Sequence, residues 1–419
     1  MARNGTKPKH LPGFLELYMD HCGTSEIPPQ FDYWCALGLI AACIQNRVWL
    51  EKFPGSKLIP NMYIFLIGPS GIGKDTAIKR AIKLTLACPK AVDIFFGRIT
   101  APWLVEVLGA TKFDKETKTR EYIHNNLWLI TPELANGIGT GPQADTFIKM
   151  TTDLYDADKP IEFQEGTRTS GKHTIPNLCF NWMAGSTREW LVESISREAV
   201  EGGFFARVIP IEAVYNPDYR VFRPSVPDNY NQLRECLQRY IFELVDIAGE
   251  VTRTPQALDV ERKWYDGRPR PDDDILMPVW KREHDTMLKI AMLLSLSEST
   301  DLLIHRRHMI AAQRLSYKAQ RIVPVLSTFG NTGARIYRRI EEFVHHRGTV
   351  TRSQLMGKFV KEGIDSRDMT RILDSLVEAR RIKKTREKRT QYYTWLGRFP
   401  LESLLAADDP NLPPEEEPE

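Results

Sequence analysis

The sequence contains no long apolar run, no signal-peptide pattern and no large excess of charge of one sign. Its longest apolar stretch, around residues 34–44, is too short to span a bilayer, and residues 1–10 lack the apolar segment of a signal peptide. Lysine and arginine number 57 against 54 aspartates and glutamates, so the net charge of +3 does not by itself indicate a partner. These absences predict a cytoplasmic protein without a membrane partner.

Cysteine is also scarce, and no two cysteines have the CxxC spacing of a zinc or redox site. We expect reduced, packed thiols at Cys22, Cys35, Cys43, Cys88, Cys179 and Cys236. The hydrophobic share of 42% and the charged share of 26% are typical of a folded globular chain, and 419 residues suffice for two or three domains.

The most informative stretch is residues 61–80, where an apolar run enters a glycine-rich loop that continues as a helix pattern. Gly68 and Gly73 stand where the phosphate-binding pattern GxxxxGK(S/T) requires glycine, and Lys74 follows directly. Backbone N–H groups of such a loop surround a phosphate, the positive end of the helix faces it, and the lysine reaches the β and γ phosphates. The predicted ATP site is Gly68, Pro69, Ser70, Gly71, Ile72, Gly73, Lys74, Asp75 and Thr76. The alternative is a glycine turn that binds nothing.

The loop departs from this pattern at Asp75, where a Ser or Thr hydroxyl normally contacts Mg²⁺. Thr76 follows one position later, and both side chains offer the oxygen atoms that Mg²⁺ prefers as ligands. Asp75 and Thr76 are therefore the predicted metal ligands.

A second buried strand is predicted at residues 127–130, and Thr131, Pro132 and Glu133 follow it. P-loop ATPases place an acidic pair here, but Pro132 takes the first position, so only Glu133 remains to orient and deprotonate the attacking water. Asp75 is a candidate for the lost carboxylate. Alternatively, Glu133 only caps the following helix.

Two later strands end or begin at polar residues. After the apolar run at residues 178–184, Ser186 or Thr187 is placed to sense the γ phosphate, or else to cap the helix that follows. Arg207 precedes a further strand, where its guanidinium can reach the γ phosphate bound by a neighbouring subunit and stabilise the transition state. The alternative for Arg207 is an ordinary surface arginine.

Residues 161–175 alternate in polarity around a glycine-containing centre, which predicts a hairpin with a cationic tip. Arg168, Lys172 and His173 would contact a nucleic-acid backbone there, unless the hairpin is merely solvated. Helices then dominate from residue 216 to about residue 325, and we expect them to form a bundle of their own that acts as a lid. Its most apolar helix carries Arg282, a candidate nucleotide sensor; alternatively Arg282 belongs with Lys281 and Lys289 to a solvated face.

Residues 330–398 have the element order of a winged helix and contain 17 lysines and arginines against 8 acidic residues between 331 and 398. This basic charge favours DNA, although winged helices also dock proteins. The expected DNA contacts are Lys383, Lys384, Arg386, Lys388 and Arg389. Residues 399–419 are acidic and proline-rich, so we expect a disordered tail that is a candidate site for a replication partner.

In sequence order, GPSGIGKDT, LWLITPELA, NWMAGSTREWL and EGGFFARVIPIE resemble the AAA+ ATPase module of phage and mobile-element primase-helicase proteins, over residues 30–325. The hairpin, the arginine in FFARV and the winged helix also resemble minichromosome maintenance helicases. The resemblance implies that Lys74 binds phosphate, Glu133 activates water, Arg207 is an arginine finger and the Lys172 hairpin lines a central channel. Asp75 and Pro132 depart from the family pattern.

The predicted fold is α/β: a P-loop NTPase (AAA+-like) core with a helical lid and a C-terminal winged-helix domain. The expected divisions are an N-terminal helical segment (1–60), the ATPase core (61–215), the lid (216–329), the winged helix (330–398) and the acidic tail (399–419).

The favoured function is an Mg²⁺-dependent ATPase that assembles as a homo-oligomeric ring, a hexamer, and moves along single-stranded or forked DNA as a helicase. A second hypothesis is an ATP-switched replication initiator or helicase loader that binds DNA without unwinding it. A third is a small-molecule kinase, which predicts a monomer and gives the basic winged helix no role.

Overall fold

The computed structural model divides the chain into two compact units, Met1–Ser327 and Thr328–Glu419. The division falls close to residue 330, where the sequence predicts the start of the winged helix. The residues that the structure describes are 13–86, 88, 92–113, 120–122, 126–138, 142–156, 161–163, 173–175, 178–194, 203–214, 225–271, 276–320, 339–340, 343–344, 347–360, 364–378, 382–387 and 390–396.

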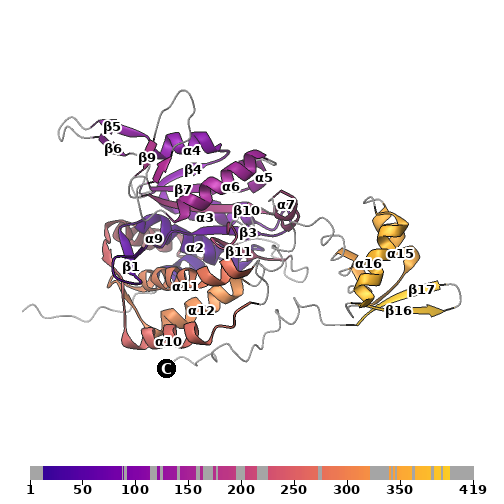
Figure 1. Ribbon diagram of the computed structural model, residues 1–419. Helices are drawn as coiled ribbons and strands as arrows, with labels where there is room; N and C mark the ends of the chain where they lie inside the picture. The colour runs from indigo at the N-terminus through magenta and orange to yellow at the C-terminus, as the bar shows by residue number, and fades with distance from the viewer. Residues whose placement is uncertain are drawn as a thin grey trace, which may run out of the picture. The chain divides into compact units, whose positions relative to one another are not determined.

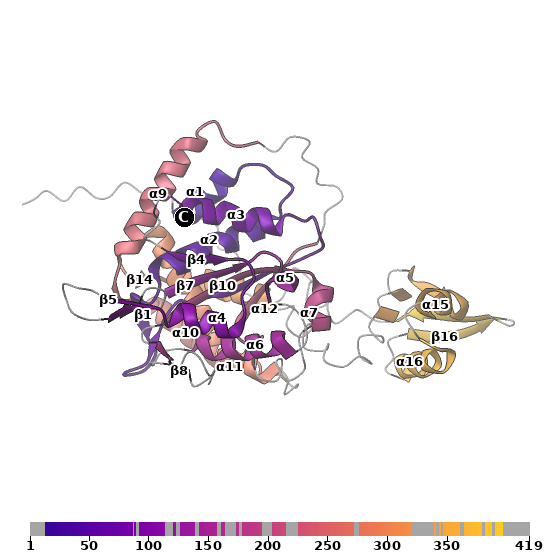
Figure 2. The ribbon, with the colours of Figure 1, turned by 90° about the horizontal axis from the view of Figure 1, so that it is seen from above.

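A five-stranded, entirely parallel sheet forms the centre of the first unit (Figures 1 and 2). The strand order is β11-β3-β10-β7-β4, with the bounds β3 (Tyr63–Ile67), β4 (Asp93–Phe96), β7 (Asn126–Thr131), β10 (Cys179–Ser186) and β11 (Val208–Glu212). β3 and β10 are buried along their whole length, as parallel strands covered on both faces usually are. The predicted α/β class is therefore confirmed.

The register brings the carboxyl ends of the three strands around the glycine loop to one level. Ile67 at the end of β3 pairs with Ser186 on one side and with Glu212 on the other. The next strand, β7, joins the far side of β10 through the pair Thr131 and Ala184. Segments that leave β3, β7, β10 and β11 therefore meet at one edge of the sheet, where parallel α/β sheets usually bind ligands.

Helices from both ends of the unit share one hydrophobic core with one face of the sheet. They are α1 (Phe14–Cys22), α2 (Pro29–Ile44), α3 (Lys74–Thr85), α9 (Tyr230–Asp246), α10 (Pro255–Gly267), α11 (Met277–Glu298) and α12 (Arg306–Gln320). Their buried side chains form one core with Ile64, Leu66 and Ile209 of the sheet.

The helical region 216–329 is therefore not a bundle of its own, which corrects the expected separate lid. α2 is apolar on nearly every side, and it lies between the sheet and further helices, contacting β3, β10, α9 and α11. α12 contacts β11 directly. Because these helices complete the cover of α2 and the sheet, they belong to the same compact unit as the P-loop.

The opposite face of the sheet is aromatic and packs against α4 (Ala101–Leu108), α5 (Leu134–Ile138) and α6 (Pro142–Tyr155) (Figure 1). The ring of Trp182 lies 4.9 Å from that of Phe65 and 5.5 Å from that of Phe147, both in edge-to-face contact. The hydroxyl of Tyr63 donates a 2.6 Å hydrogen bond to the carbonyl of Thr151, which ties α6 to β3.

Shorter elements complete the first unit. They are β1 (Val48–Glu51) with β2 (Lys57–Leu58) and β12 (Gly249–Glu250), the pair β13 (Thr252–Arg253) and β14 (Leu303–Ile304), the hairpins β5 (Thr111–Phe113) with β6 (Arg120–Tyr122) and β8 (Ile161–Phe163) with β9 (His173–Ile175), and α7 (Arg188–Ser194). The hairpin predicted at residues 161–175 is present in its two strands. Within the described residues, no helix has the length and apolarity needed to cross a membrane.

The second unit has its own core and an antiparallel sheet of order β15-β17-β16. Its described elements are β15 (Thr349–Thr351), α15 (Arg352–Phe359), α16 (Ser366–Glu378), β16 (Ile382–Glu387) and β17 (Thr390–Trp395). Thr351 and Gln354 form a capping box at the start of α15. All of these elements lie within residues 330–398, the segment that the sequence sets apart as a separate domain.

Candidate nucleotide-binding site

The predicted phosphate loop leaves β3 at Gly68 and enters α3 at Lys74. Gly71 and Gly73 have φ values of +84° and +95°, in the left-handed region that glycine adopts without strain. At Gly73 a side chain is excluded a second time, because a Cβ atom there would lie 2.7 Å from Cγ1 of Ile27. The local sequence therefore produces the strand, loop and helix that a phosphate-binding loop requires. The loop from Gly68 to Lys74 is called the cradle.

Lys74 is the main cation of this loop, and its side chain folds back over it. Its Nζ donates hydrogen bonds to the carbonyl oxygens of Gly68 at 2.6 Å and Pro69 at 2.9 Å, and the residue is 6% exposed. Burial lowers the pKa of Lys74, while the charges of Glu133 and Glu189 act to raise it. A bound phosphate would replace the two carbonyls as acceptors for this ammonium.

Glu133 follows β7 and lies at the same edge of the sheet as Lys74. The end of β7 comes close to β10 because Gly185 has no side chain: a Cβ atom there would lie 2.2 Å from the carbonyl oxygen of Pro132 and 3.5 Å from Cβ of Lys74. The backbone carbonyl of Glu133 accepts the N–H groups of Asn136 and Gly137 at the start of α5. Its carbonyl thus serves the helix, whereas its carboxylate acts on Lys74.

Ser186 and Thr187 lie at the end of β10, between the P-loop strand and the strand that carries Glu133. The Oγ1 of Thr187 accepts a 3.2 Å hydrogen bond from the N–H of Trp190, so this hydroxyl caps α7, as the second interpretation predicts. Ser186 is fully buried, and its hydroxyl donates to the carbonyl of Thr187 at 3.1 Å. Its own carbonyl accepts the N–H of Gly68, which joins the end of β10 to the start of the loop.

Three charged residues at this edge, Arg188, Glu189 and Glu212, were missed by the sequence analysis. Arg188 forms an ion pair with Glu212, and Glu189 acts on Lys74 electrostatically. Arg188 and Glu189 directly follow the polar end of β10, the same placement that identified Ser186 and Thr187, whereas no local pattern points to Glu212 at the end of β11.

Asp75 and Thr76, the predicted metal ligands, occupy the first turn of α3 and are both exposed. The carboxylate of Asp75 pairs with Nζ of Lys79 one turn later, at 2.6 Å. Within the described residues, no group of three or more His, Cys, Asp or Glu side chains is arranged to hold a metal ion. The carboxylate and hydroxyl still suit Mg²⁺, which usually takes one or two protein ligands together with substrate phosphates.

Arg207 lies at the opposite edge of the sheet from the cradle of its own chain. Val208 pairs with Tyr63, so Arg207 is level with the start of β3, roughly 20 Å along the strand from Gly68. Its Nη2 and Nε contact Oδ2 of Asp156 at 2.5 and 3.2 Å, and its Nη1 donates to the carbonyl of Gly203. With 11% of its side chain exposed, it is not an ordinary surface arginine.

Arg282 binds the same carboxylate, which corrects its assignment as a sensor of the nucleotide in its own chain. Its two terminal nitrogens lie 2.7 Å from the two oxygens of Asp156. Burial raises the pKa of Asp156, but hydrogen bonds from Arg282 and the charge of Arg207 outweigh it and lower the pKa. Because Asp156 also binds Arg207, Arg282 lies at the edge of the sheet far from the loop.

Lys289 is likewise not part of a solvated face. It is 3% exposed, its Nζ donates to Oδ1 of Asn61 at 2.6 Å, and it lies 3.9 Å from the centre of the Tyr155 ring. Burial lowers the pKa of Lys289 to about 7. The amine thus joins α11 to the segment that enters β3.

The predicted DNA-binding residues are only partly within the described residues. Lys383, Lys384 and Arg386 lie on β16 with exposed side chains, and Lys384 contacts Asp374 at 3.3 Å. Of His173 the structure describes only the backbone, at the start of β9 opposite Phe163. Arg168, Lys172, Lys388, Arg389 and the acidic tail lie outside the described residues.

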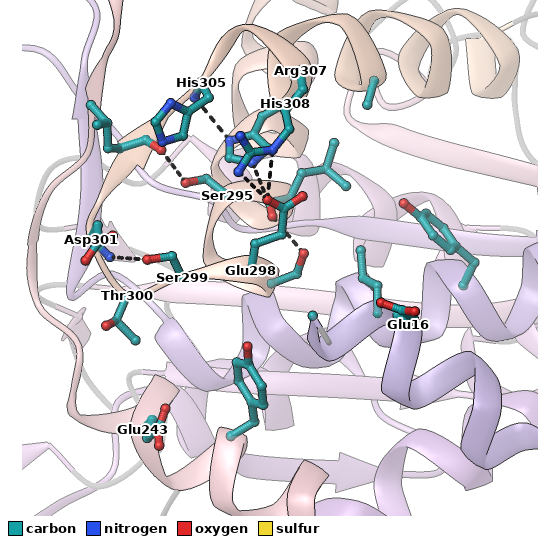
Figure 3. A pocket seen from close by; sticks show the side chains of 18 residues that line it. Glu16, Glu243, Ser295, Glu298, Ser299, Thr300, Asp301, His305, Arg307 and His308 are labelled. Atoms are coloured by element: carbon teal, nitrogen blue, oxygen red, sulfur yellow. Dashed lines mark hydrogen bonds and ion pairs between the residues drawn. The ribbon is translucent and has the colours of Figure 1, made fainter. Parts of the chain in front are cut away.

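One pocket in the described part of the chain lies away from the cradle. Figure 3 shows the side chains that line it. Its volume is about 1160 Å³, and residues of α1, α2, α9, α11, α12 and the segment between α11 and α12 line it. At its centre Glu298 accepts hydrogen bonds from His308 and Arg307, which outweigh burial and lower the pKa of Glu298 to about 2. No residue of the glycine loop lines this pocket, so its size does not make it the nucleotide site.

Comparison with known proteins adds no assignment: a scan against protein-family models and a search of curated proteins both find no match.

Proposed function

We propose that this protein is an ATP-dependent DNA helicase: an ATPase that assembles as a homo-oligomeric ring and translocates along single-stranded or forked DNA. The observation that carries the ATPase part is the cradle after β3, in which Lys74 folds over a glycine loop at the carboxyl edge of a parallel sheet and lies under the influence of Glu133. The proposal also takes the first unit as an AAA+-like core and the second as a winged helix.

The chemistry follows from the charges at that edge. Lys74 would leave the carbonyls of Gly68 and Pro69 and bind the β and γ phosphates, while the N–H groups at the start of α3 face the same anion. Glu133 would orient the attacking water and accept its proton, and Ser186 would respond to the γ phosphate through its contact with the loop. Mg²⁺, when bound, supplies charge neutralisation of the phosphates, and Thr76 and Asp75 are the residues that would hold it.

Ring assembly is proposed from the position of Arg207. A guanidinium at the edge of the sheet far from its own cradle can act only on a nucleotide held by another copy of the chain. In a ring, which we propose to be a hexamer, each subunit would complete the site of its neighbour. Asp156 would hold Arg207 until a neighbour's phosphate competes for it.

DNA binding is proposed for the hairpins and the second unit. Lys383, Lys384 and Arg386 are exposed cations on β16, and a polyanion is the natural partner of such a basic strand. Arg168 and Lys172, which lie between β8 and β9 in the sequence, would contact the DNA strand in the central channel of the ring. The acidic segment 399–419 is proposed to bind a replication partner.

An initiator or loader is the second candidate, favoured by the ion pair between Asp75 and Lys79. This pair engages the only carboxylate of the loop, while Pro132 occupies the place of a second acid. A chain with these two changes would bind ATP as a switch and hydrolyse it slowly.

The test measures ATP binding, ATP hydrolysis and fork unwinding on one preparation of the full chain, beside the Lys74→Ala variant. We expect the native chain to bind ATP, to hydrolyse it faster with single-stranded DNA and to open the fork, and Lys74→Ala to lose binding by about a hundredfold or more. ATP binding with a closed fork would favour the loader, and equal ATP affinity in both proteins would overturn the assignment of the cradle.

A further inference from the structure

The carboxyl edge of the sheet holds an ion pair that the mechanism above does not use. Nε of Arg188 donates to Oε1 of Glu212 at 2.7 Å, and Nη2 contacts the same oxygen. Arg188 begins α7 two residues after the end of β10, and Glu212 is the last residue of β11. The side chains are 28% and 25% exposed, so both remain accessible to solvent.

The strand order places this pair across the P-loop strand. β10 and β11 are the two neighbours of β3, and Ser186 and Glu212 both pair with Ile67, the residue before the glycine loop. Strands two positions apart are separated by about 10 Å, so Arg188 and Glu212 can meet only by crossing the end of β3. The guanidinium therefore lies beside the point where the cradle begins at Gly68.

Several carboxylates surround this point, so a bound triphosphate would need a cation such as Arg188 to offset their negative charge. Glu133 and Glu189 both act on Lys74, and Glu212 adds a third carboxylate at the same edge. A terminal phosphate brought to this edge would be repelled by these acids and attracted by Arg188. A guanidinium exchanges a carboxylate for a phosphate readily, because both accept two parallel N–H···O bonds.

Resting on the proposed function, we infer that Arg188 contacts the terminal phosphate of the nucleotide bound to its own chain. Glu212 holds the guanidinium in place until a triphosphate enters, and the phosphate oxygens then replace the carboxylate as acceptors. ADP has no terminal phosphate, so Arg188 stays with Glu212 in the diphosphate complex. Arg188 therefore distinguishes ATP from ADP within one subunit, a task separate from that of Arg207.

The experiment measures the affinities of the full chain for ADP and for a non-hydrolysable ATP analogue, with Mg²⁺, by titration calorimetry. Arg188→Ala is expected to lower the affinity for the ATP analogue by about tenfold to a hundredfold and to change the affinity for ADP by less than about threefold. Glu212→Gln, which frees the guanidinium of Arg188, is expected to raise the affinity for the ATP analogue by a few fold. Arg307→Ala is the matched control, because it removes an arginine paired with a glutamate at a distant pocket.

Opposite signs for the Arg188 and Glu212 variants support the inference, because a merely structural ion pair would give the same sign in both. If Arg188→Ala keeps the native ratio of the two affinities, or weakens both nucleotides equally, the inference is overturned while the proposed ATP site stands. If the native chain binds neither nucleotide, the proposed function fails and the inference fails with it.

Discussion

Replacing Gly185 with alanine tests whether the segment after β7, which carries Glu133, packs against Gly185 beside the cradle. The new Cβ atom would lie 2.2 Å from the carbonyl oxygen of Pro132, whereas a close C···O contact is about 3.3 Å. The carbonyl must therefore move by roughly 1 Å. Glu133 is the next residue along the chain and must move with it. Cβ of Lys74, only 3.5 Å away, limits the space on the other side.

Two effects of this displacement can be estimated. Overpacking of a close-packed site costs about 1–3 kcal/mol, which lowers the melting temperature of the full chain by a few degrees. A catalytic group misplaced by about 1 Å loses rate by roughly a hundredfold, so hydrolysis should fall far more than nucleotide affinity. Thermal melting and steady-state ATP hydrolysis measure the two effects separately.

Gly267→Ala is the matched control for this variant. Gly267 ends α10, and a Cβ atom there would meet no atom within 4 Å, so neither melting nor hydrolysis should change. If Gly185→Ala melts and hydrolyses ATP like the native chain, the carbonyl of Pro132 does not lie against Gly185, and the placement of Glu133 beside Lys74 is wrong.

Three further predictions concern the charged groups. Burial lowers the pKa of Lys289 to about 7, whereas the unfolded chain keeps this proton to about pH 10.4, so folding releases a proton between these values. The stability of the native chain relative to Lys289→Met should therefore rise by about 2 kcal/mol from pH 7 to pH 9 in urea unfolding, and a constant difference would show that the amine titrates normally. Arg207→Ala should bind ATP but not hydrolyse it, and mixing it with Lys74→Ala should restore part of the activity; no recovery on mixing would count against a shared site. Lys383→Ala combined with Arg386→Ala should weaken single-stranded DNA binding and reduce the slope of log affinity against log salt by about 2, with basal hydrolysis unchanged, and an unaltered slope would remove β16 from the DNA site.

Local patterns predicted the cradle well, because each of its parts is decided by neighbours in the sequence. The apolar run of β3 can only be a buried strand, and Gly73 adopts a positive φ that favours glycine over any residue with a Cβ atom. The helix after Lys74 and the strands before Glu133 and Ser186 follow from the same kind of pattern.

The positions of Arg282 and Lys289 could not be predicted in this way, because they depend on which helix packs against which end of a strand. The apolar pattern of α11 shows that the helix is buried but not that Lys289 reaches Asn61. The same limit explains the missed pair of Arg188 and Glu212. These residues lie 24 positions apart and meet only because β10 and β11 flank β3.

The prediction of a separate helical lid was wrong for a related reason. An amphipathic helix pattern shows that one face is buried, but the partner is chosen by the whole fold. Here α2, apolar on nearly every side, needs cover on more than one side, and α9 and α11 supply it.

The most direct test of the central claim is the rate of ATP hydrolysis by the full chain with and without single-stranded DNA, measured beside Lys74→Ala. The account predicts basal hydrolysis that rises several-fold with DNA and disappears in the variant. Hydrolysis that persists in Lys74→Ala, or a native chain that neither binds nor hydrolyses ATP, would contradict it.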